Sequence, residues 1–375
     1  MNIIFTCGGT GGHIFPAIAV AKLFRERQPG CNILFIGAED GMETDLVPRE
    51  GFRLETVRIS NFQRGLTVEA FKHNAETFHH MNAAIFRARS VIRSFHPDII
   101  IGTGGYASFP ALCEGARMGV RTIVHESNAV PGLTTRMVER GADAILVGFE
   151  ESRAYYHDPE RVRVTGTPVR DEFFFADRQK ARQKLQLGER PLVVSYWGSL
   201  GAREMNKMIA GVIRLECEQN EPFVHIHATG RFGWKWMPDH IRQSGVLLSE
   251  HPSVDLREFI YDMPDVMAAA DLVICRAGAA TISEVCASAT PCIMVPSPNV
   301  TDNHQEKNAR VLENAGAAVV LRENELDSAL LYHTVCDLLA DKNRLQQMRK
   351  ASAALAPVGA AERIYEAALE MIRKG

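Results

Sequence analysis

Short apolar runs alternate with helix-length segments along this chain, and that alternation restricts its fold more than any other feature. The runs in the first half span residues 3–7, 33–37, 54–59, 99–102, 122–125 and 144–148. Those in the second half span residues 192–196, 224–228, 256–260, 272–275, 291–295 and 317–321. Apolar strands separated by helices usually pair in parallel, with helices on both faces of the sheet. The sequence therefore predicts an α/β protein with two parallel sheets.

The pattern breaks near residue 166, and the break divides the chain. Residues 166–187 hold a Thr-Pro-Val-Arg sequence, an aromatic triplet and a charged stretch, which is typical of a connection. A chain of 375 residues also exceeds what one hydrophobic core usually supports. We predict an N-terminal domain over residues 1–166, a linker over 167–190 and a C-terminal domain over 191–356. Residues 357–375 should form a helix that packs back toward the N-terminal domain.

Charge and cysteine content limit the class of protein. The formal net charge is -3, which argues against a protein that binds nucleic acid through a long basic face. The eight cysteines are scattered and form no Cys-x-x-Cys pair, which favours reduced thiols. No apolar run approaches the roughly 20 residues that span a bilayer, and the apolar opening at residues 2–5 is too short for a signal peptide. We expect a cytoplasmic protein.

Four glycine-containing loops follow predicted strands. They are GGTGGH at residues 8–13, GTGGY at 102–106, GSLGA at 198–202 and RAGA at 276–279. Loops at the carboxyl ends of parallel strands offer free N–H groups at a helix start, where phosphates bind. Glycine also serves tight turns, but its recurrence at equivalent strand ends favours ligand binding.

A nicotinamide dinucleotide site is the first alternative. Glu39 or Asp40, after the second strand, could bind the ribose of such a cofactor. However, the first loop does not fit Gly-x-Gly-x-x-Gly, because Ile14 occupies the place of the last glycine. The pattern therefore disfavours a dehydrogenase.

Seven short strings, in order, resemble the signatures of the MurG-type glycosyltransferases. The strings are GGTGGHIFPA at 8–17, TGGYASFPA at 103–111, HESNAVPG at 125–132, GTPVR at 166–170, GSLGA at 198–202, CRAGAATISE at 275–284 and DNHQEKNA at 302–309. The resemblance implies two Rossmann-like domains with parallel sheets facing across a cleft, the GT-B type. It also implies transfer of N-acetylglucosamine from UDP-N-acetylglucosamine, bound mainly by the C-terminal domain, to undecaprenyl-diphosphate-linked muramyl pentapeptide, bound by the N-terminal domain. The implied reaction inverts the anomeric carbon, forms a β-1,4 bond and releases UDP, which yields lipid II for peptidoglycan synthesis.

The chain departs from that pattern at three positions. Trp197 stands where a glycine commonly precedes the GSxGA loop. Leu200 replaces a residue that is often polar, and His304 occupies a position that can be glutamine.

Inversion in one displacement needs a base for the acceptor hydroxyl. His13 ends the first glycine loop, and imidazole has a suitable pKa, although the same residue could cap a helix or donate to phosphate. Glu126, directly after a strand at the same sheet edge, is the other candidate; it could instead orient a histidine or cap a loop.

The resemblance also implies a donor site. Ser199 and the N–H groups of residues 198–202 suit the diphosphate, and Arg170 and Arg276 could add charge-assisted contacts or serve only as salt-bridge partners. Glu284 could accept both ribose hydroxyls. The remaining donor-binding candidates are Thr10, Gly11, Gly12, Asn128, Gln305 and Asn308. The acceptor-side candidates are Gly104, Gly105, Tyr106 and His125.

No metal or cofactor is expected. A metal that bridges the diphosphate would ordinarily need an Asp-x-Asp pair, and the sequence contains none. His225 and His227 point the same way from one predicted strand but lack a third ligand nearby.

The segment 67–95 carries an apolar stripe at helical spacing. Its members are Phe71, Phe78, Met81, Ile85, Ile92 and Phe95, most simply a core face. Phe86 lies on the flank near Arg89 and Arg93, with Arg87 further round the helix, a mixture suited to an anionic membrane or to plain solvent. The resemblance favours a peripheral position on the cytoplasmic face of the plasma (inner) membrane, and the loop at residues 62–65 could contribute.

Two other functions remain open on a scaffold of this kind. One is a UDP-N-acetylglucosamine epimerase, which needs an acid–base pair around the donor sugar and no lipid site. The other is a non-catalytic protein that binds nucleotide sugars.

Overall fold

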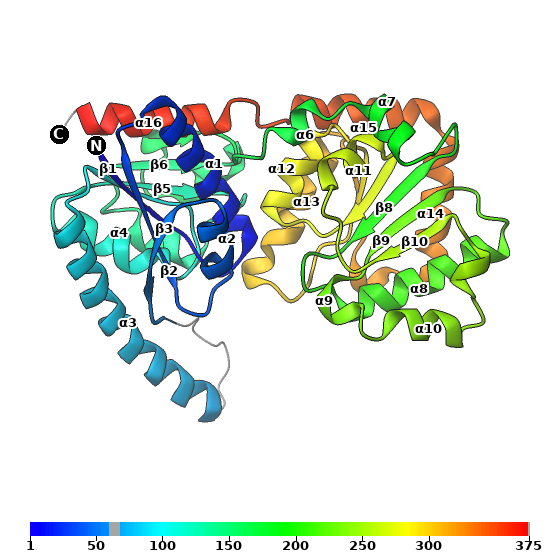
Figure 1. The fold of residues 1–375 in the computed structure, drawn as a ribbon, viewed down its shortest axis with the longest axis horizontal. Coiled ribbons are helices and arrows are strands. Elements are labelled where there is room, and N and C mark those ends of the chain that lie inside the picture. The colour runs from blue at the N-terminus through cyan, green and yellow to red at the C-terminus, as the bar shows by residue number, and fades with distance from the viewer. Residues whose placement is uncertain (60–67, 374–375) are drawn as a thin grey trace. The chain divides into compact units, whose positions relative to one another are not determined.

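The computed structural model describes residues 1–59 and 68–373, except the side chains of residues 68–76, 78–79 and 301. The chain forms two compact units: Met1–Arg170 with Pro357–Gly375, and Asp171–Ala356. Each unit contains a parallel sheet with helices on both faces (Figure 1). The predicted α/β class with two parallel sheets is confirmed.

The sheet of unit 1 has seven strands in the order β3-β2-β1-β4-β5-β6-β7. The strands are β1 (Asn2–Thr6), β2 (Asn32–Ala38), β3 (Arg53–Val57), β4 (Ile99–Gly102), β5 (Arg121–Glu126), β6 (Ala144–Val147) and β7 (Val162–Val164). The helices are α1 (Gly11–Arg27), α2 (Glu43–Arg49), α3 (Val68–Phe95), α4 (Ser108–Arg117), α5 (Leu133–Val138) and α16 (Ala360–Arg373), with 3-10 turns η1 (Glu150–Tyr155) and η2 (Pro159–Arg161).

Alternate residues of the strands in unit 1 form two cores. Ile3 and Phe5 face one side of β1 and pack in a cluster that includes Phe24 of α1 and Ile364 of α16. Ile4 faces the other side, in a cluster with residues of α3 and α4. Because successive strand side chains point to opposite faces, a sheet covered on both sides needs strands that are apolar throughout.

Helix α16 is part of unit 1 although it ends the chain. The ring of its Tyr365 lies 4.6 Å from that of Phe24, and Gln28 Nε2 donates to the Tyr365 hydroxyl at 3.0 Å. The apolar face of this amphipathic helix therefore packs against α1.

Unit 2 contains a six-stranded sheet in the order β10-β9-β8-β11-β12-β13. The strands are β8 (Leu192–Tyr196), β9 (Val224–Ala228), β10 (Val254–Arg257), β11 (Leu272–Cys275), β12 (Cys292–Met294) and β13 (Ala318–Val320). The helices are α6 (Glu172–Phe175), α7 (Arg178–Lys184), α8 (Arg203–Glu218), α9 (Gly230–Gly233), α10 (Met237–Gln243), α11 (Met263–Ala269), α12 (Ala279–Ala287), α13 (His304–Asn314), α14 (Ser328–Ala340) and α15 (Lys342–Ala354), with 3-10 turns η3 (Leu248–Glu250), η4 (Thr301–Asn303) and η5 (Glu323–Glu325).

Each of the twelve predicted apolar runs overlaps a strand, and one of the strands in the described residues was not predicted. The additional strand, β7, has only three residues, of which Val162 alone is buried, so it leaves no apolar run in the sequence. The predicted linker over 167–190 differs from the observed division, because residues from Asp171 onward belong to unit 2. In particular, the Arg178 and Arg182 side chains on α7 bond to Asp271 at the start of β11.

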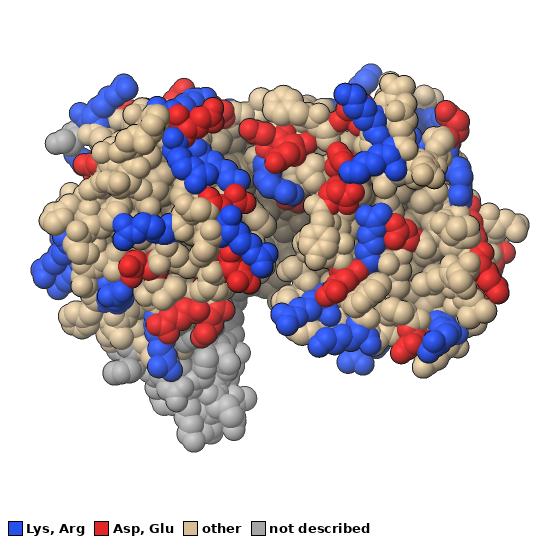
Figure 2. All heavy atoms as spheres, viewed as in Figure 1, with Lys and Arg blue, Asp and Glu red and all other residues tan. Residues whose placement is uncertain are grey.

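Basic and acidic side chains are interspersed on the face of each unit that Figure 2 shows. None of the described helices is long and apolar enough to cross a bilayer.

Candidate active site

Both sheets have their topological switch point between the first and the fourth strand of the unit. In unit 1 this point lies between β1 and β4, and in unit 2 between β8 and β11. The connections that follow the two neighbouring strands run in opposite directions from this point, which opens a crevice between them. Open α/β sheets bind ligands in such a crevice. The four glycine loops predicted from the sequence follow these four strands. Each unit therefore has one such crevice, and we call the loops at each crevice the half-site of that unit.

In unit 1 the loops after β1 and β4 pack backbone against backbone. Gly105 has a φ of +83°, and a Cβ there would overlap the carbonyl oxygen of Gly8. Glu43 Oε2 accepts from Gly9 N–H at 3.2 Å and its Oε1 from Ala38 N–H at 2.7 Å, so this buried carboxylate secures the first loop.

His13 is anchored to the second loop. Its Nδ1 lies 3.1 Å from the Thr103 carbonyl oxygen, and the Thr103 hydroxyl donates to the His13 carbonyl at 2.6 Å. Because a carbonyl only accepts, Nδ1 carries a proton, and in the tautomer with a single ring proton Nε2 is the proton acceptor. A Cβ on Gly104 would lie 2.7 Å from Nδ1, so glycine makes room for the imidazole.

Tyr106 lies against the first glycine loop. A Cβ on Gly9 would be 2.9 Å from its ring. Burial, with Glu43 and Asp40 nearby, raises the pKa of the Tyr106 phenol, so it stays a neutral donor.

Thr10, Gly11 and Gly12 begin helix α1. Thr10 is exposed, and its carbonyl accepts from the N–H groups of His13 and Ile14. The first turn of α1 has no acidic residue. Arg170 is exposed at the end of this part of unit 1.

Glu126 holds its own loop together. Its Oε1 accepts from the backbone and side-chain amides of Asn128, both at 3.0 Å. Its Oε2 accepts from Gly132 N–H at 2.9 Å and from the Thr135 hydroxyl at 2.8 Å. This carboxylate accepts four hydrogen bonds, and only 3 % of its surface is exposed. These features fit the loop-capping role better than the role of a base.

His125 is fully buried in β5. Its Nε2 donates to the Gly166 carbonyl at 2.9 Å, and its Nδ1 has no hydrogen-bond partner among the described residues. Burial is the main cause that lowers the pKa of His125, so the ring is neutral. His125 therefore has no exposed surface with which to contact a ligand.

In unit 2 the loop after β8 is a turn with two positive φ angles. Gly198 has a φ of +84° and Gly201 a φ of +78°, and Gly201 N–H donates to the Gly198 carbonyl at 3.1 Å. A Cβ on Gly201 would overlap the Thr229 carbonyl. Ser199 is exposed at the tip of this turn, which leads into α8.

Arg276 lies in the loop after β11. Its Nη1 contacts Glu323 Oε2 at 2.6 Å and donates to the Val295 carbonyl at 3.0 Å, and its guanidinium lies 5.6 Å from the centre of the Trp197 ring. Trp197, which stands where a glycine is common, is 5 % exposed and belongs to the core of unit 2. Its ring therefore packs beneath Arg276 and does not occupy the space of the glycine loop.

The remaining donor candidates lie on α12 and α13. Glu284 is half-buried on α12. Gln305 Oε1 accepts from Ser297 N–H at 2.9 Å. Asn308 is fully buried and donates to the Ala277 carbonyl at 3.1 Å, so it supports the Arg276 loop and does not present its amide to solvent.

His225 and His227 are held in a buried chain of hydrogen bonds. Ser195 Oγ lies 2.7 Å from His225 Nε2 and 2.6 Å from His227 Nδ1, and Glu216 bonds to His225 at 2.7 Å. Within the described part of the chain, no group of three or more histidine, cysteine or acidic residues could hold a metal ion.

Three residues of the half-sites were not predicted from the sequence: Thr103, Glu43 and Glu323. Each acts on a predicted residue or loop that lies far away in the sequence. Only the position of Thr103, directly before two glycines at a strand end, gave a local signal.

Comparison with known protein families identifies the family to which this chain belongs. The Glycosyltransferase family 28 N-terminal domain matches residues 3–147, and the Glycosyltransferase family 28 C-terminal domain matches residues 193–364. The chain belongs to glycosyltransferase family 28. This family 28 chain is therefore a transferase, and the resemblance found in its motifs is confirmed.

Curated relatives match this chain over almost its whole length. The protein of Acetivibrio thermocellus named UDP-N-acetylglucosamine--N-acetylmuramyl-(pentapeptide) pyrophosphoryl-undecaprenol N-acetylglucosamine transferase is 41 % identical, with 98 % of this chain and 97 % of the relative covered. The protein of the same name from Caldanaerobacter subterraneus is 37 % identical, with 98 % of each covered. The crystal structure of MurG from Acinetobacter baumannii has a TM-score of 0.75 at 25 % identity and covers 98 % of this chain and 99 % of that one. A putative UDP-N-acetylglucosamine 2-epimerase from Listeria monocytogenes shares the fold at 14 % identity, with a TM-score of 0.71 and coverage of 100 % and 97 %.

Proposed function

We propose that this protein transfers N-acetylglucosamine from UDP-N-acetylglucosamine to the 4-hydroxyl of undecaprenyl-diphosphate-linked N-acetylmuramyl pentapeptide. The bond between the sugar anomeric carbon and the UDP oxygen breaks, a β-1,4 bond forms with inversion, and UDP leaves. The observation that carries this proposal is a pair of half-sites at the two switch points: an exposed amide turn in unit 2, and in unit 1 a histidine whose Nδ1 lies 3.1 Å from the Thr103 carbonyl oxygen. The two substrates of the proposal are those that appear in the names of relatives matched over nearly their full length.

His13 is the proposed base. The Thr103 carbonyl fixes the tautomer whose Nε2 accepts the proton of the acceptor hydroxyl. Glu126 is the second candidate from the sequence, but its four hydrogen bonds support a positioning role: it holds Asn128 in place for the donor sugar.

The leaving diphosphate is assigned to the turn that starts at Gly198. Amides at the start of a helix and the Ser199 hydroxyl suit the developing charge. Arg276 adds a cation that Glu323 and Trp197 hold in place. Glu284 is assigned to the ribose hydroxyls.

The other donor contacts are assigned by the motifs that carry them: Thr10, Gly11, Gly12, Asn128, Arg170 and Gln305. Asn308 is assigned an indirect part, through the Ala277 carbonyl. On the acceptor side, Gly104, Gly105 and Tyr106 form the proposed surface, and His125 supports it from within β5.

A lipid-linked acceptor requires a peripheral position on the cytoplasmic face of the inner membrane. The exposed Phe86 on α3, 68 % accessible, and the exposed Arg93 support such a contact. Arg87 and Arg89 contribute less than predicted from the sequence, since they pair with Glu55 and Glu114, each at 2.7 Å. The predicted loop at residues 62–65 and the side chains of Phe71 and Phe78 lie outside the described residues, while Met81, Ile92 and Phe95 pack in the core.

Incubation with radiolabelled UDP-N-acetylglucosamine, with and without a short-chain lipid-linked muramyl peptide, tests the proposal. UDP release that depends on the acceptor, and that persists in EDTA, is expected. Interconversion of the donor sugar without acceptor would indicate an epimerase, and binding without release would indicate a nucleotide-sugar binding protein. Either result would overturn the proposed transfer.

A further inference from the structure

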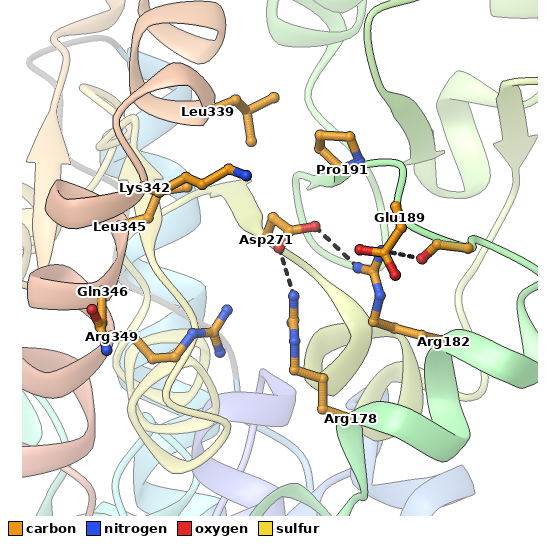
Figure 3. Close-up of a pocket in the computed structure, with 11 residues that line it drawn as sticks. Arg178, Arg182, Glu189, Pro191, Asp271, Leu339, Lys342, Leu345, Gln346 and Arg349 are labelled. Carbon is orange, nitrogen blue, oxygen red and sulfur yellow. Dashed lines mark hydrogen bonds and ion pairs between the residues drawn. The ribbon is translucent and has the colours of Figure 1, made fainter.

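Unit 2 has a cavity of about 370 Å³ at the edge of the sheet opposite the proposed donor half-site (Figure 3). Asp271, in its wall, accepts from Leu192 N–H at 2.9 Å, at the amino end of β8. The turn at Gly198 follows the carboxyl end of the same strand. The five residues of β8 separate the two places by roughly 16 Å, at about 3.3 Å per residue. The cavity is therefore distinct from the donor half-site.

Cations outnumber carboxylates in its wall. Helix α7 provides Arg178 and Arg182, and helix α15 provides Lys342 and Arg349. The carboxylates are Glu189 and Asp271. Two positive charges are thus left in excess around a cavity whose volume lies at the lower end of small-molecule sites.

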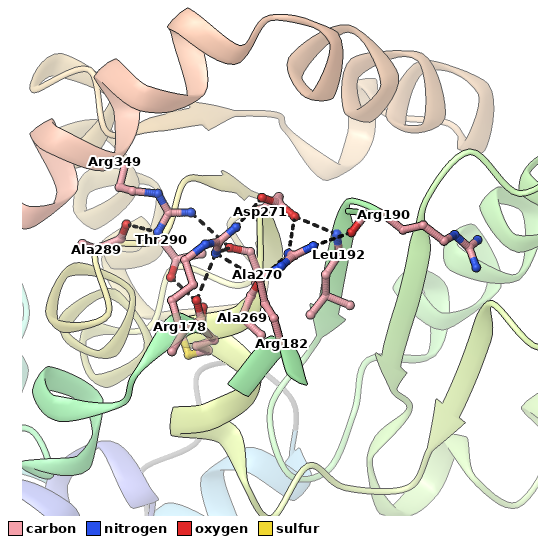
Figure 4. Close-up of polar contacts among 12 residues, drawn as sticks. Arg178, Arg182, Arg190, Leu192, Ala269, Ala270, Asp271, Ala289, Thr290 and Arg349 are labelled. Atoms are coloured by element: carbon pink, nitrogen blue, oxygen red, sulfur yellow. Dashed lines mark hydrogen bonds and ion pairs between the residues drawn. The ribbon is translucent and has the colours of Figure 1, made fainter. Parts of the chain in front are cut away.

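Asp271 forms its ion pairs with the α7 side of the cavity. Its Oδ1 lies 2.5 Å from Arg178 Nη2, and its Oδ2 lies 3.1 Å from Arg182 Nη1 (Figure 4). Arg178 and Arg182 also donate to the backbone carbonyls of residues 268–270 and of Gly188 and Arg190. These two arginines therefore have structural partners, and one carboxylate serves both.

Arg349, on α15, differs from them because no described carboxylate pairs with it. It donates to the carbonyls of Ala289 and Ala270, at 3.0 and 3.1 Å, but makes no ion pair with any carboxylate in the described part of the chain. Burial, and then the charge of Arg178, lower the pKa of Arg349 to about 10, which still leaves it charged at neutral pH. A desolvated cation beside a like charge is stabilised by an anion that reaches both.

Lys342 and Gln346 lie on the same face of α15 as Arg349. The spacing of 342, 346 and 349 brings them to one side of a helix, and all three line the cavity. Lys342 is exposed and, like Arg349, forms no ion pair with a carboxylate among the described residues. An ammonium, an amide and a guanidinium together provide donors for several oxygens of one anion.

We propose that this cavity binds a phosphate group, held by Lys342, Gln346 and Arg349 of α15. The group could be free phosphate or the headgroup of an anionic lipid, since both offer the same oxygens. The site does not depend on the activity proposed above.

Isothermal titration calorimetry with inorganic phosphate, and co-sedimentation with phosphatidylcholine vesicles with or without phosphatidic acid, test the proposal. Lys342→Ala should weaken binding about tenfold, the equivalent of one charge-assisted hydrogen bond. Gln346→Glu, which places a carboxylate in the cavity at an exposed position, should weaken it at least as much. The matched controls Lys350→Ala and Gln347→Glu make the same changes on α15 outside the cavity and should leave binding as in the wild type.

Saturable binding of inorganic phosphate, lost in the two cavity variants only, would identify a soluble phosphate ligand. Binding to the phosphatidic acid vesicles alone, with the same pattern of variants, would identify a headgroup. Absence of both kinds of binding would overturn the proposal. An isotherm that Lys342→Ala and Gln346→Glu leave unchanged would also overturn it, because the anion would then lie elsewhere, for example at the Gly198 turn.

Discussion

Glu126 Oε1 accepts two hydrogen bonds from Asn128, one from the backbone amide and one from the side chain, each 3.0 Å long. Together with the bonds from Gly132 and Thr135, they use both oxygens of the carboxylate. Glu126→Gln places an NH₂ group against donors, so we expect the free energy of unfolding to fall by about 1–3 kcal/mol. Urea denaturation and acceptor-dependent UDP release measure the two effects. An unchanged stability with turnover reduced more than about a hundredfold, the range of general base catalysis, would instead make Glu126 the base.

Gly104→Ala tests whether the position of His13 matters. The substitution puts a methyl group 2.7 Å from Nδ1 at a φ of +101°. Gly119→Ala is the matched control, because Gly119 also has a positive φ, +75°, but open space around it. Both variants should lose about 1–2 kcal/mol of stability from backbone strain. Only Gly104→Ala should also lower turnover, by tenfold or more. Equal turnover in the two variants would show that the imidazole can move without loss.

Trp197 is predicted to support both the core and Arg276. Trp197→Ala should lower the free energy of unfolding by about 3–5 kcal/mol and raise the KM for the donor, because the guanidinium loses the ring that lies 5.6 Å away. Trp197→Phe keeps a ring and removes an indole N–H that has no partner in the described part of the chain, so its effects should be much smaller. Donor titrations and urea denaturation compare the two variants. A donor KM that is the same in both would remove the ring from the binding site.

Much of the fold and part of the site could be predicted from the sequence. The strands are apolar on both faces, so runs such as 99–102 mark them without ambiguity, and the glycines at 104 and 105 mark places where backbones approach closely. The short β7 and the membership of α7 in unit 2 depend on contacts between distant positions, such as Arg178 with Asp271, which no local pattern encodes.

The same reason explains the limits at the site. Asn308 is in the expected motif, but its burial and its bond to Ala277 come from the packing of α13. Glu126 is in the expected loop, but its four donors come together only when the chain turns at Gly132. The motifs predicted where the half-sites lie. The packing in the structure distinguishes residues that can contact a ligand from residues, such as Asn308 and Glu126, that hold the neighbouring loops in place.

Unit 2 should lose stability in acid through His227. Burial, and then the neighbouring His225, lower the pKa of His227 well below its ordinary value in the folded protein. An unfolded histidine titrates near pH 6.5, so below that pH the unfolded chain binds a proton that the folded one does not. The free energy of unfolding should therefore be highest above pH 6.5 and fall as the pH decreases, by about 1.4 kcal/mol per pH unit for this one proton. His227→Gln should flatten the slope by that amount in urea denaturation between pH 6.5 and 5, whereas the difference at pH 8 reports packing alone. A slope that the variant leaves unchanged would contradict this assignment.

His13→Ala and Glu284→Ala should affect different constants. His13 is assigned to proton transfer and is bonded to Thr103 of unit 1, so its loss should lower kcat by a factor of about 10² to 10⁴ while the donor Kd changes little. Glu284 is assigned to the ribose hydroxyls, and its loss should weaken donor binding by roughly tenfold, the equivalent of one hydrogen bond to a charged group, with a smaller effect on kcat. Fluorescence titration with UDP-N-acetylglucosamine gives the Kd, and UDP release at saturating donor and acceptor gives kcat. If His13→Ala reduced donor affinity and rate equally, its imidazole would be a donor ligand, and the base would have to be sought in Glu126.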